Sequence, residues 1–118
     1  MKINTIQELL GANLICHEDH LDHEVYSACG SDMMSDVLAY VKDQAVLLTG
    51  LVNPQVIRTA EMMDMVCIVF VRSKLPTPEM VQLAEESGIV LMATDKRMYE
   101  ACGILYSNGL IGNKVKHV

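Results

Sequence analysis

The chain has 118 residues, which fits one ordinary domain and excludes a two-domain enzyme with a separate cofactor domain. Hydrophobic residues make up 51% of the sequence and charged residues 20%, so the composition is globular rather than disordered. Nine basic and fifteen acidic residues give a formal net charge of −6, which argues against nucleic-acid and anionic-membrane binding, since phosphate contacts need a concentrated positive surface.

The N-terminal segment predicts a helix followed by a hairpin. Apolar residues on one face predict a helix over residues 4–10, which Gly11 can end in the left-handed conformation. Two short strands are expected at 14–17 and 25–29, and we expect them to pair across the polar turn at 18–22.

Helices and strands then alternate. Ser31 or Asp32 can cap a helix that leads to an apolar strand at 45–48. Asn53, followed by proline at the first helical position, caps the next helix, which precedes the strongest strand in the chain at 66–71.

The same order continues to the C-terminus. Thr77 and the proline after it open a helix that leads to a strand at 89–93. Thr94 and Asp95 are expected to cap a final helix, and the tail from about residue 110 is expected to be loosely held.

These elements predict the fold class. The apolar strands lack the alternation of a half-exposed sheet, which indicates burial on both faces. Successive helix–strand units predict right-handed crossovers. We therefore expect one α/β domain over residues 1–118, with a mostly parallel central sheet and helices on both faces.

A ligand site is expected where the loops after the parallel strands meet. Helix N-termini there would favour an anion by roughly 0.3–1 kcal/mol, and nearby basic side chains would add positive charge. The candidate ligand-binding residues are Ser31, Gly50, Asn53, Arg72, Ser73, Lys74 and Thr94. Asp32 and Asp95 argue against a densely negative ligand, and the alternative is that these residues only cap helices or carry solvated charge.

The segment 16–24 holds three of the four histidines together with a cysteine and four carboxylates. Imidazole, thiolate and carboxylate are all ligands of transition metals. In the predicted hairpin, His17 and His23 would face each other with His20 at the tip, so these three are weak candidates for a metal site. The alternative is a polar, exposed turn with a mild response to pH.

The sequence carries no recognisable catalytic signature. It has no phosphate loop, GxGxxG, GxSxG or HExxH motif, so neither enzyme activity nor a cofactor is expected. The four cysteines form no CxxC pair and are expected to be reduced thiols. With no signal-peptide core and no apolar run near the roughly 20 residues of a membrane span, we expect a cytoplasmic protein without membrane contact.

Short segments match, in order, the pattern of a known domain family. They are Ile-Gln-Glu-Leu-Leu at 6–10, Glu24–Val25, the run at 31–38, the turn at 49–53, the segment at 76–84, Gly88–Ile89, Tyr-Glu-Ala at 99–101 and Asn108–Gly109. Over nearly its whole length the chain resembles the DRTGG-domain family, whose fold is shared with the N-terminal domain of HPr kinase/phosphorylase. The eponymous Asp-Arg-Thr-Gly-Gly string is absent, and Phe70–Pro76 stands where family members often carry a Thr-Gly-Gly-like turn.

The resemblance implies a regulatory or ligand-sensing module. Such domains occur attached to HPr kinase, phosphate acetyltransferases and CBS pairs, and stand-alone versions resemble products of anaerobe gene clusters that include iron hydrogenases. The resemblance implies no catalytic residues, because the HPr kinase active site lies in another domain.

Three functional hypotheses follow. The first is a non-catalytic, homodimeric module that senses a small anionic metabolite or nucleotide at the carboxyl ends of the strands. The second is a protein-interaction adaptor without a ligand, linked to hydrogenase or other anaerobic metabolism. The third is a metal-handling protein that uses the segment from His17 to His23.

Overall fold

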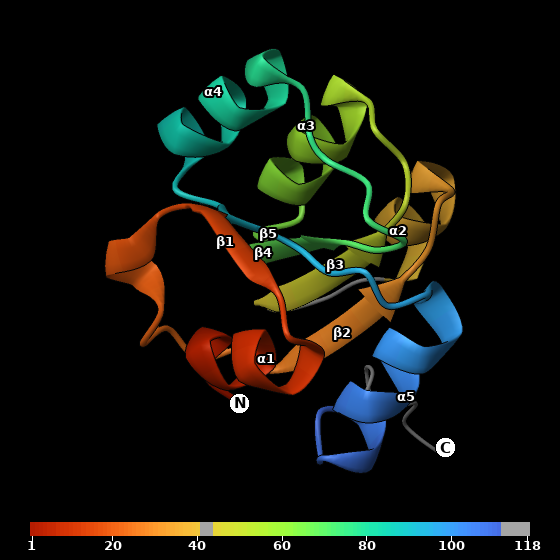
Figure 1. Cartoon of the computed structure of the whole chain (residues 1–118). Coiled ribbons are helices and arrows are strands. Elements are labelled where there is room, and N and C mark those ends of the chain that lie inside the picture. Colours follow the sequence, from red (N-terminus) through yellow and green to blue (C-terminus); the bar gives the residue numbers. More distant parts are fainter. Residues whose placement is uncertain (41–43, 112–118) are drawn as a thin grey trace.

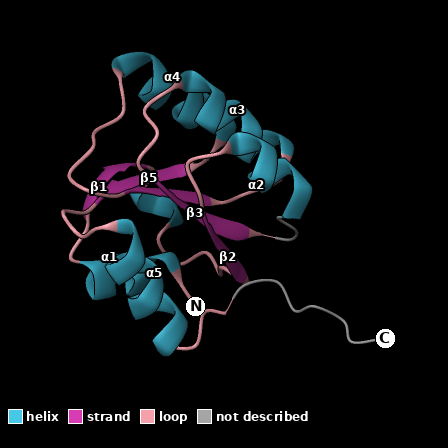
Figure 2. Ribbon diagram, turned by 90° about the vertical axis from the view of Figure 1, so that its right-hand side faces the viewer, coloured by secondary structure: helices cyan, strands magenta, loops and turns pink. Residues whose placement is uncertain are grey.

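A computed structural model describes residues 1–40 and 44–111, which form three layers (Figures 1 and 2). In chain order the elements are α1 (Ile3–Leu10), β1 (Asn13–Cys16), the 3₁₀ turn η1 (Glu18–His20), β2 (Ser27–Gly30), α2 (Met34–Tyr40), β3 (Ala45–Thr49), α3 (Pro54–Met62), β4 (Cys67–Phe70), α4 (Pro78–Ser87), β5 (Val90–Ala93) and α5 (Met98–Ser107). The sheet lies between α2, α3 and α4 on one face and α1 and α5 on the other. The expected α/β class with helices on both faces is confirmed.

The sheet has five strands in the order β1-β5-β4-β3-β2. Four neighbouring strands, β2 to β5, run parallel, and only β1 is antiparallel, at the edge beside β5. Four parallel strands bring four downstream loops to one edge of the sheet, which is the arrangement that the predicted ligand site requires.

The predicted hairpin is wrong. β1 pairs with β5 and β2 pairs with β3, so the two strands lie at opposite edges of the sheet. The segment between them runs along the N-terminus: the Asn4 N–H donates to the Leu21 carbonyl at 3.0 Å and the Val25 N–H donates to the Met1 carbonyl at 2.7 Å. These bonds carry the chain past α1 to the far edge.

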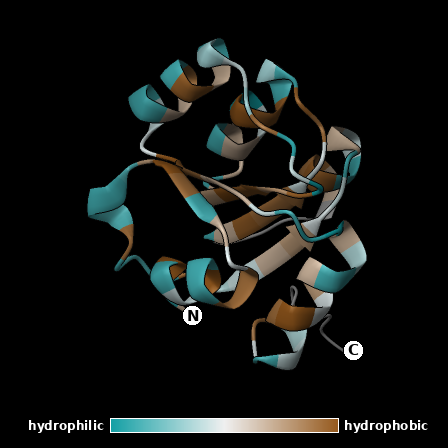
Figure 3. Cartoon of the chain, viewed as in Figure 1, coloured by the Kyte–Doolittle hydropathy of each residue, from teal (hydrophilic) through white to brown (hydrophobic). Residues whose placement is uncertain are grey.

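Burial on both faces explains the apolar strands. Every residue of β3, β4 and β5 is buried. Along β3, Ala45 and Leu47 pack into the core under α2, α3 and α4, whereas Val46 and Leu48 pack into the core under α1 and α5. Figure 3 shows the result, with hydrophobic strands inside and hydrophilic outer turns on the helices.

Several predicted helix ends are confirmed. The Asn53 side chain accepts from the Gln55 N–H at 2.8 Å, and the Thr77 hydroxyl accepts from the Met80 N–H at 3.3 Å. Gly11 and Gly88 end α1 and α4 with φ of 58° and 73°, the left-handed region that suits glycine.

Other predicted ends are wrong. α5 begins at Met98 with Arg97 at its N-cap, so Thr94 and Asp95 do not cap it. Its C-terminus is better held than expected, because Leu110 is buried and its N–H donates to the Leu105 carbonyl at 3.0 Å. The rest of the predicted loose tail, from residue 112, lies outside the described residues.

Candidate functional site

The loops that follow β2 to β5 are joined to one another by backbone hydrogen bonds. The Arg72 N–H donates to the Lys96 carbonyl at 2.8 Å, and the Ser73 N–H donates to the Thr94 carbonyl at 2.9 Å. On the other side, the Ser31 N–H donates to the carbonyl of the last apolar residue of β3 at 3.0 Å. The loops therefore form a connected rim at one edge of the sheet.

Asp32 anchors the centre of this rim. Its Oδ1 accepts from the Gly50 N–H at 2.7 Å and from the Thr49 hydroxyl at 3.0 Å. The Thr49 hydroxyl in turn accepts from the Leu51 N–H at 3.1 Å. The sequence suggested Asp32 as a helix cap or a source of repulsion, but the carboxylate instead fixes the loop after β3. The Ser31 hydroxyl, the other cap candidate, accepts from the Met33 N–H at 3.0 Å, in the turn just before α2 begins at Met34.

Arg72 lies over the same loop. Its Nη2 is 3.6 Å from Asp32 Oδ2, and both side chains are about half exposed. Gly50 makes this position available, since a Cβ there would collide with the Arg72 guanidinium. The Arg72 guanidinium therefore lies directly against the backbone of residue 50, which any side chain other than that of glycine would prevent.

The backbone that carries Arg72 is strained. Arg72 and Ser73 both have φ of 58°, so two successive residues other than glycine occupy the left-handed region. Such positions cost of order 1–3 kcal/mol each and cluster at functional sites. Both residues therefore hold a backbone conformation that is typical of glycine, while they carry a cation and a hydroxyl.

The rim loops carry more basic than acidic residues, although the chain as a whole is acidic. The loops after β4 and β5 carry four of the nine basic residues, namely Arg72, Lys74, Lys96 and Arg97. Only two acidic residues, Asp32 and Asp95, lie in the rim loops, although the chain as a whole has a net charge of −6. This local excess of positive charge favours an anionic ligand.

The remaining predicted site residues divide into three groups. Ser73 and Lys74 are exposed on the rim beside Arg72. The Ser31 side chain is engaged in the turn before α2, and the Asn53 side chain caps α3. Thr94 is buried, and its hydroxyl donates to the Leu10 carbonyl at 2.7 Å, which ties β5 to α1.

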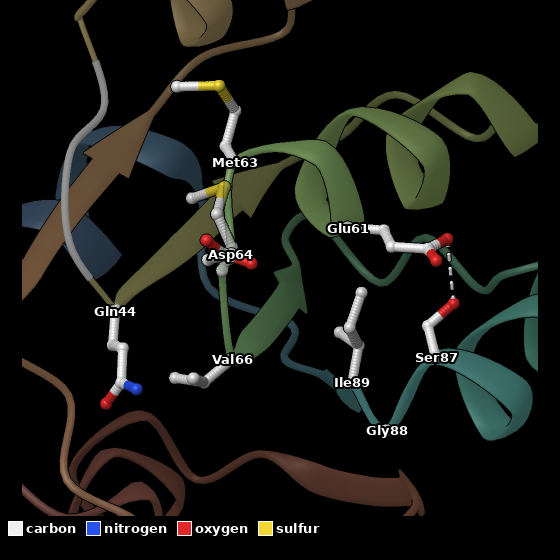
Figure 4. Close-up of a pocket in the computed structure, with 9 residues that line it drawn as sticks. Gln44, Glu61, Met63, Asp64, Val66, Ser87, Gly88 and Ile89 are labelled. Carbon is white, nitrogen blue, oxygen red and sulfur yellow. Dashed lines mark hydrogen bonds between the residues drawn. The ribbon is translucent and has the colours of Figure 1, made fainter.

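A separate cavity of about 510 Å³ lies at the opposite edge, where the strands begin (Figure 4). Val66 and Ile89, which precede β4 and β5, form part of its wall, and the Ser87 hydroxyl donates to Glu61 at 3.0 Å across it. Of its nine described lining residues two are acidic and none is basic, so this cavity does not suit an anion. The sequence analysis did not foresee it.

The cysteines offer no activated nucleophile. All four are free thiols, as expected. Burial raises the pKa of each of them, most strongly that of Cys67, which is fully buried. A raised pKa keeps a thiol protonated and unreactive at neutral pH.

The lengths of the helices bear on the expected lack of membrane contact. Within residues 1–40 and 44–111, no helix is both long and apolar enough to span a bilayer.

Comparisons with known proteins support the fold. No protein-family model and no curated protein matches the chain. Among solved structures, the chain is similar to the CBS and DRTGG domains of the regulatory region of Clostridium perfringens pyrophosphatase, complexed with its activator diadenosine tetraphosphate. The TM-score is 0.73 at 12% identity, over 88% of this chain and 45% of the other.

At that identity the likeness shows the fold alone, and the chain spans less than half of the chain it resembles. The expected resemblance to a DRTGG-type fold is thus supported, while the relationship to HPr kinase stays a prediction.

Proposed function

We propose that this protein is a non-catalytic regulatory module that binds a small anionic metabolite at the rim formed by the loops after β2 to β5. The observation that carries the proposal is Arg72, which a strained turn holds against Asp32 and over Gly50. Strain of this kind is retained where it positions a group for function.

The Arg72–Asp32 pair suits exchange with a ligand. Half-exposed pairs of this kind are worth only about 0.2–1 kcal/mol, so Arg72 can leave Asp32 at little cost. A phosphate or carboxylate could then take the place of the Asp32 carboxylate as the partner of the guanidinium, with two parallel hydrogen bonds. Binding would move Arg72 relative to the loop after β3, and a regulatory partner could detect that movement.

Nucleotides are the first candidates among anions. The pyrophosphatase regulatory region with the similar fold was solved with diadenosine tetraphosphate as activator. The rim offers up to four basic side chains, which fits one or two phosphates better than a long polyphosphate because Asp32 and Asp95 oppose further charge.

The rim does not have the composition of a catalytic site. Its serine hydroxyls, on Ser31 and Ser73, have no described histidine nearby to act as a base, because His17, His20 and His23 all lie in the segment between β1 and β2. A serine nucleophile needs such a base within hydrogen-bond reach. The proposal therefore includes no reaction. Cytoplasmic location and homodimer formation remain predictions.

Thermal shift and calorimetry test the proposal. The panel would contain mono- and dinucleotides, including diadenosine tetraphosphate, together with an acyl phosphate and a sugar phosphate. A ligand at 100 times its Kd should stabilise the fold by about 2.7 kcal/mol, which shifts the Tm by roughly 10 °C for a domain of this size.

The variant Arg72→Ala should abolish that shift. Arg58→Ala is the matched control, since Arg58 is an exposed arginine within α3 and belongs to none of the rim loops. No shift with any member of the panel would argue for the adaptor hypothesis instead, and an equal shift in both variants would show that the ligand binds without Arg72.

A further inference from the structure

A second cluster of chemically active side chains lies far from the rim, in the turn that follows β1. Because β1 is antiparallel to β5, this turn lies beside the end of α4, at the edge where β5 begins. It contains His17, Asp19 and His20, and Figure 3 shows it as a hydrophilic projection of the molecule. The side chains do not have the hairpin arrangement expected from the sequence, since His17 stacks on His20, with ring centroids 4.6 Å apart, and not on His23.

Backbone carbonyls at the end of α4 orient both imidazole rings. His17 Nε2 lies 3.0 Å from the Ala84 carbonyl oxygen, and His20 Nδ1 lies 3.2 Å from the Gly88 carbonyl oxygen. A carbonyl only accepts, so in each neutral ring the nitrogen that faces it must carry the hydrogen. The other nitrogen of each ring is then left with a free lone pair.

Both free lone pairs face the same carboxylate. His17 Nδ1 is 3.9 Å from Asp19 Oδ1, and His20 Nε2 is 3.6 Å from Asp19 Oδ2. With neutral rings, this places two acceptors opposite a third acceptor, so the three groups need a donor or a cation between them. A bridging water or a proton on an imidazole would satisfy one pair, whereas a metal ion would satisfy all three groups at once.

The geometry suits a metal ion. One ligand atom from each of the three residues can be chosen so that all lie within 4.8 Å of one another. Bonds of about 2.0–2.2 Å to imidazole and carboxylate place neighbouring ligands about 3–4 Å apart, so a small closure of the turn completes the set. Backbone carbonyls that hold the far nitrogens of ligating histidines are the usual support of such sites.

The backbone gives independent support. His17 has φ of 66°, a left-handed conformation in a residue other than glycine. That conformation turns the chain immediately after β1, so that the His17 ring can reach both α4 and the ring of His20.

We propose that His17, Asp19 and His20 bind a divalent transition-metal ion of the Zn²⁺ type. Two imidazoles and one carboxylate select such ions over Mg²⁺ and Ca²⁺, which prefer oxygen ligands. Three protein ligands leave a coordination position for water or for a group from a partner. The bound ion would fasten the turn to the end of α4, and the site does not depend on the anion rim.

Calorimetric titration of the untagged full chain with Zn²⁺ tests the proposal, with Co²⁺ as a spectroscopic probe of nitrogen and oxygen ligation. We expect one ion per chain. His20→Ala should weaken binding by roughly tenfold or more, since even residues that only support metal ligands contribute about 10–100-fold.

Asp19→Asn is a second variant that separates the loss of a metal ligand from a loss of binding caused by misfolding. The Asp19 side chain is 79% exposed, so the amide is tolerated by the fold, yet it should also weaken Zn²⁺ binding. His23→Ala is the matched control, because the His23 ring lies 6.1 Å from that of His20 and is outside the ligand set, so it should leave the affinity unchanged. Absence of Zn²⁺ binding by the wild-type chain would overturn the proposal, as would binding that depends on His23 but not on Asp19 and His20.

Discussion

Substitution of Arg72 by glycine and by alanine separates the role of the guanidinium from the strain of the backbone that carries it. Both variants remove the guanidinium and its contact with Asp32, which costs about 0.2–1 kcal/mol because the pair is half exposed. They differ in the backbone. Alanine keeps the penalty of φ at 58°, whereas glycine relieves it.

The expected difference follows from two opposed effects. A left-handed residue with a Cβ costs roughly 1–2 kcal/mol, and glycine removes this cost. Glycine also makes the unfolded chain more flexible, which destabilises the folded state by about 0.5–1 kcal/mol and offsets part of the gain. Arg72→Gly should therefore be more stable than Arg72→Ala by about 1 kcal/mol, and close to the wild type. Urea denaturation at equilibrium measures the difference directly.

Both variants should lose anion binding to the same extent, because each lacks the guanidinium. If Arg72→Ala is as stable as Arg72→Gly, the turn is not strained, and the structural argument for a functional Arg72 fails. If only one of the two variants loses binding, the guanidinium is not the ligand contact.

Three further substitutions, one of them with a matched control, probe the rim and the core. Gly50→Ala should force the guanidinium of Arg72 aside and weaken anion binding several-fold in a calorimetric titration, with little change in stability. Its control is Gly103→Ala on α5, where the added methyl group meets open space, and this variant should leave binding unchanged. Thr94→Val should lower the free energy of unfolding by about 1–3 kcal/mol, because it leaves a carbonyl of α1 and a backbone N–H without their partner. A loss of anion binding without a loss of stability would contradict this and show that the hydroxyl serves a ligand. Burial raises the pKa of Cys67 above its ordinary value of 9.0, so above that pH the unfolded chain releases a proton that the native state keeps, and stability should fall with rising pH. Cys67→Ala should reduce this alkaline loss in denaturation curves measured from neutral to alkaline pH, and an identical pH dependence in both proteins would contradict the assignment.

The parallel sheet was predictable because local signals agreed with the global fold. The runs that became β3, β4 and β5 lack alternation, since the two faces of each strand pack into different cores. Asn53 and Thr77 precede prolines, and that pairing marks a helix start with little ambiguity.

The hairpin failed because pairing partners are not a local property. Two short strands around a polar turn are typical of a hairpin, and nothing in residues 14–29 reveals that β1 pairs with β5, a distant strand. The bonds from the N-terminus to residues 21–25 decide the path, and they form only in the folded chain.

The site was predictable in place but not in detail. The topology rule identified the edge at which the loops after the parallel strands meet, and the basic residues after β4 and β5 are visible in the sequence. The contact of Asp32 with Gly50 and the burial of Thr94 were not visible, since each depends on which way a polar side chain turns at the end of a strand. The absence of a Cβ at Gly50 was the one available signal.

A titration followed by amide resonances in two-dimensional NMR tests the central claim most directly. When the anion that gives the largest thermal shift is added to the labelled protein, the resonances of Gly50 and Ser73 should move in proportion to occupancy, while those of Ser87 and Gly88 at the opposite edge stay fixed. Shifts confined to Ser87 and Gly88, or no shifts at saturating ligand, would contradict a ligand site at the carboxyl ends of the strands.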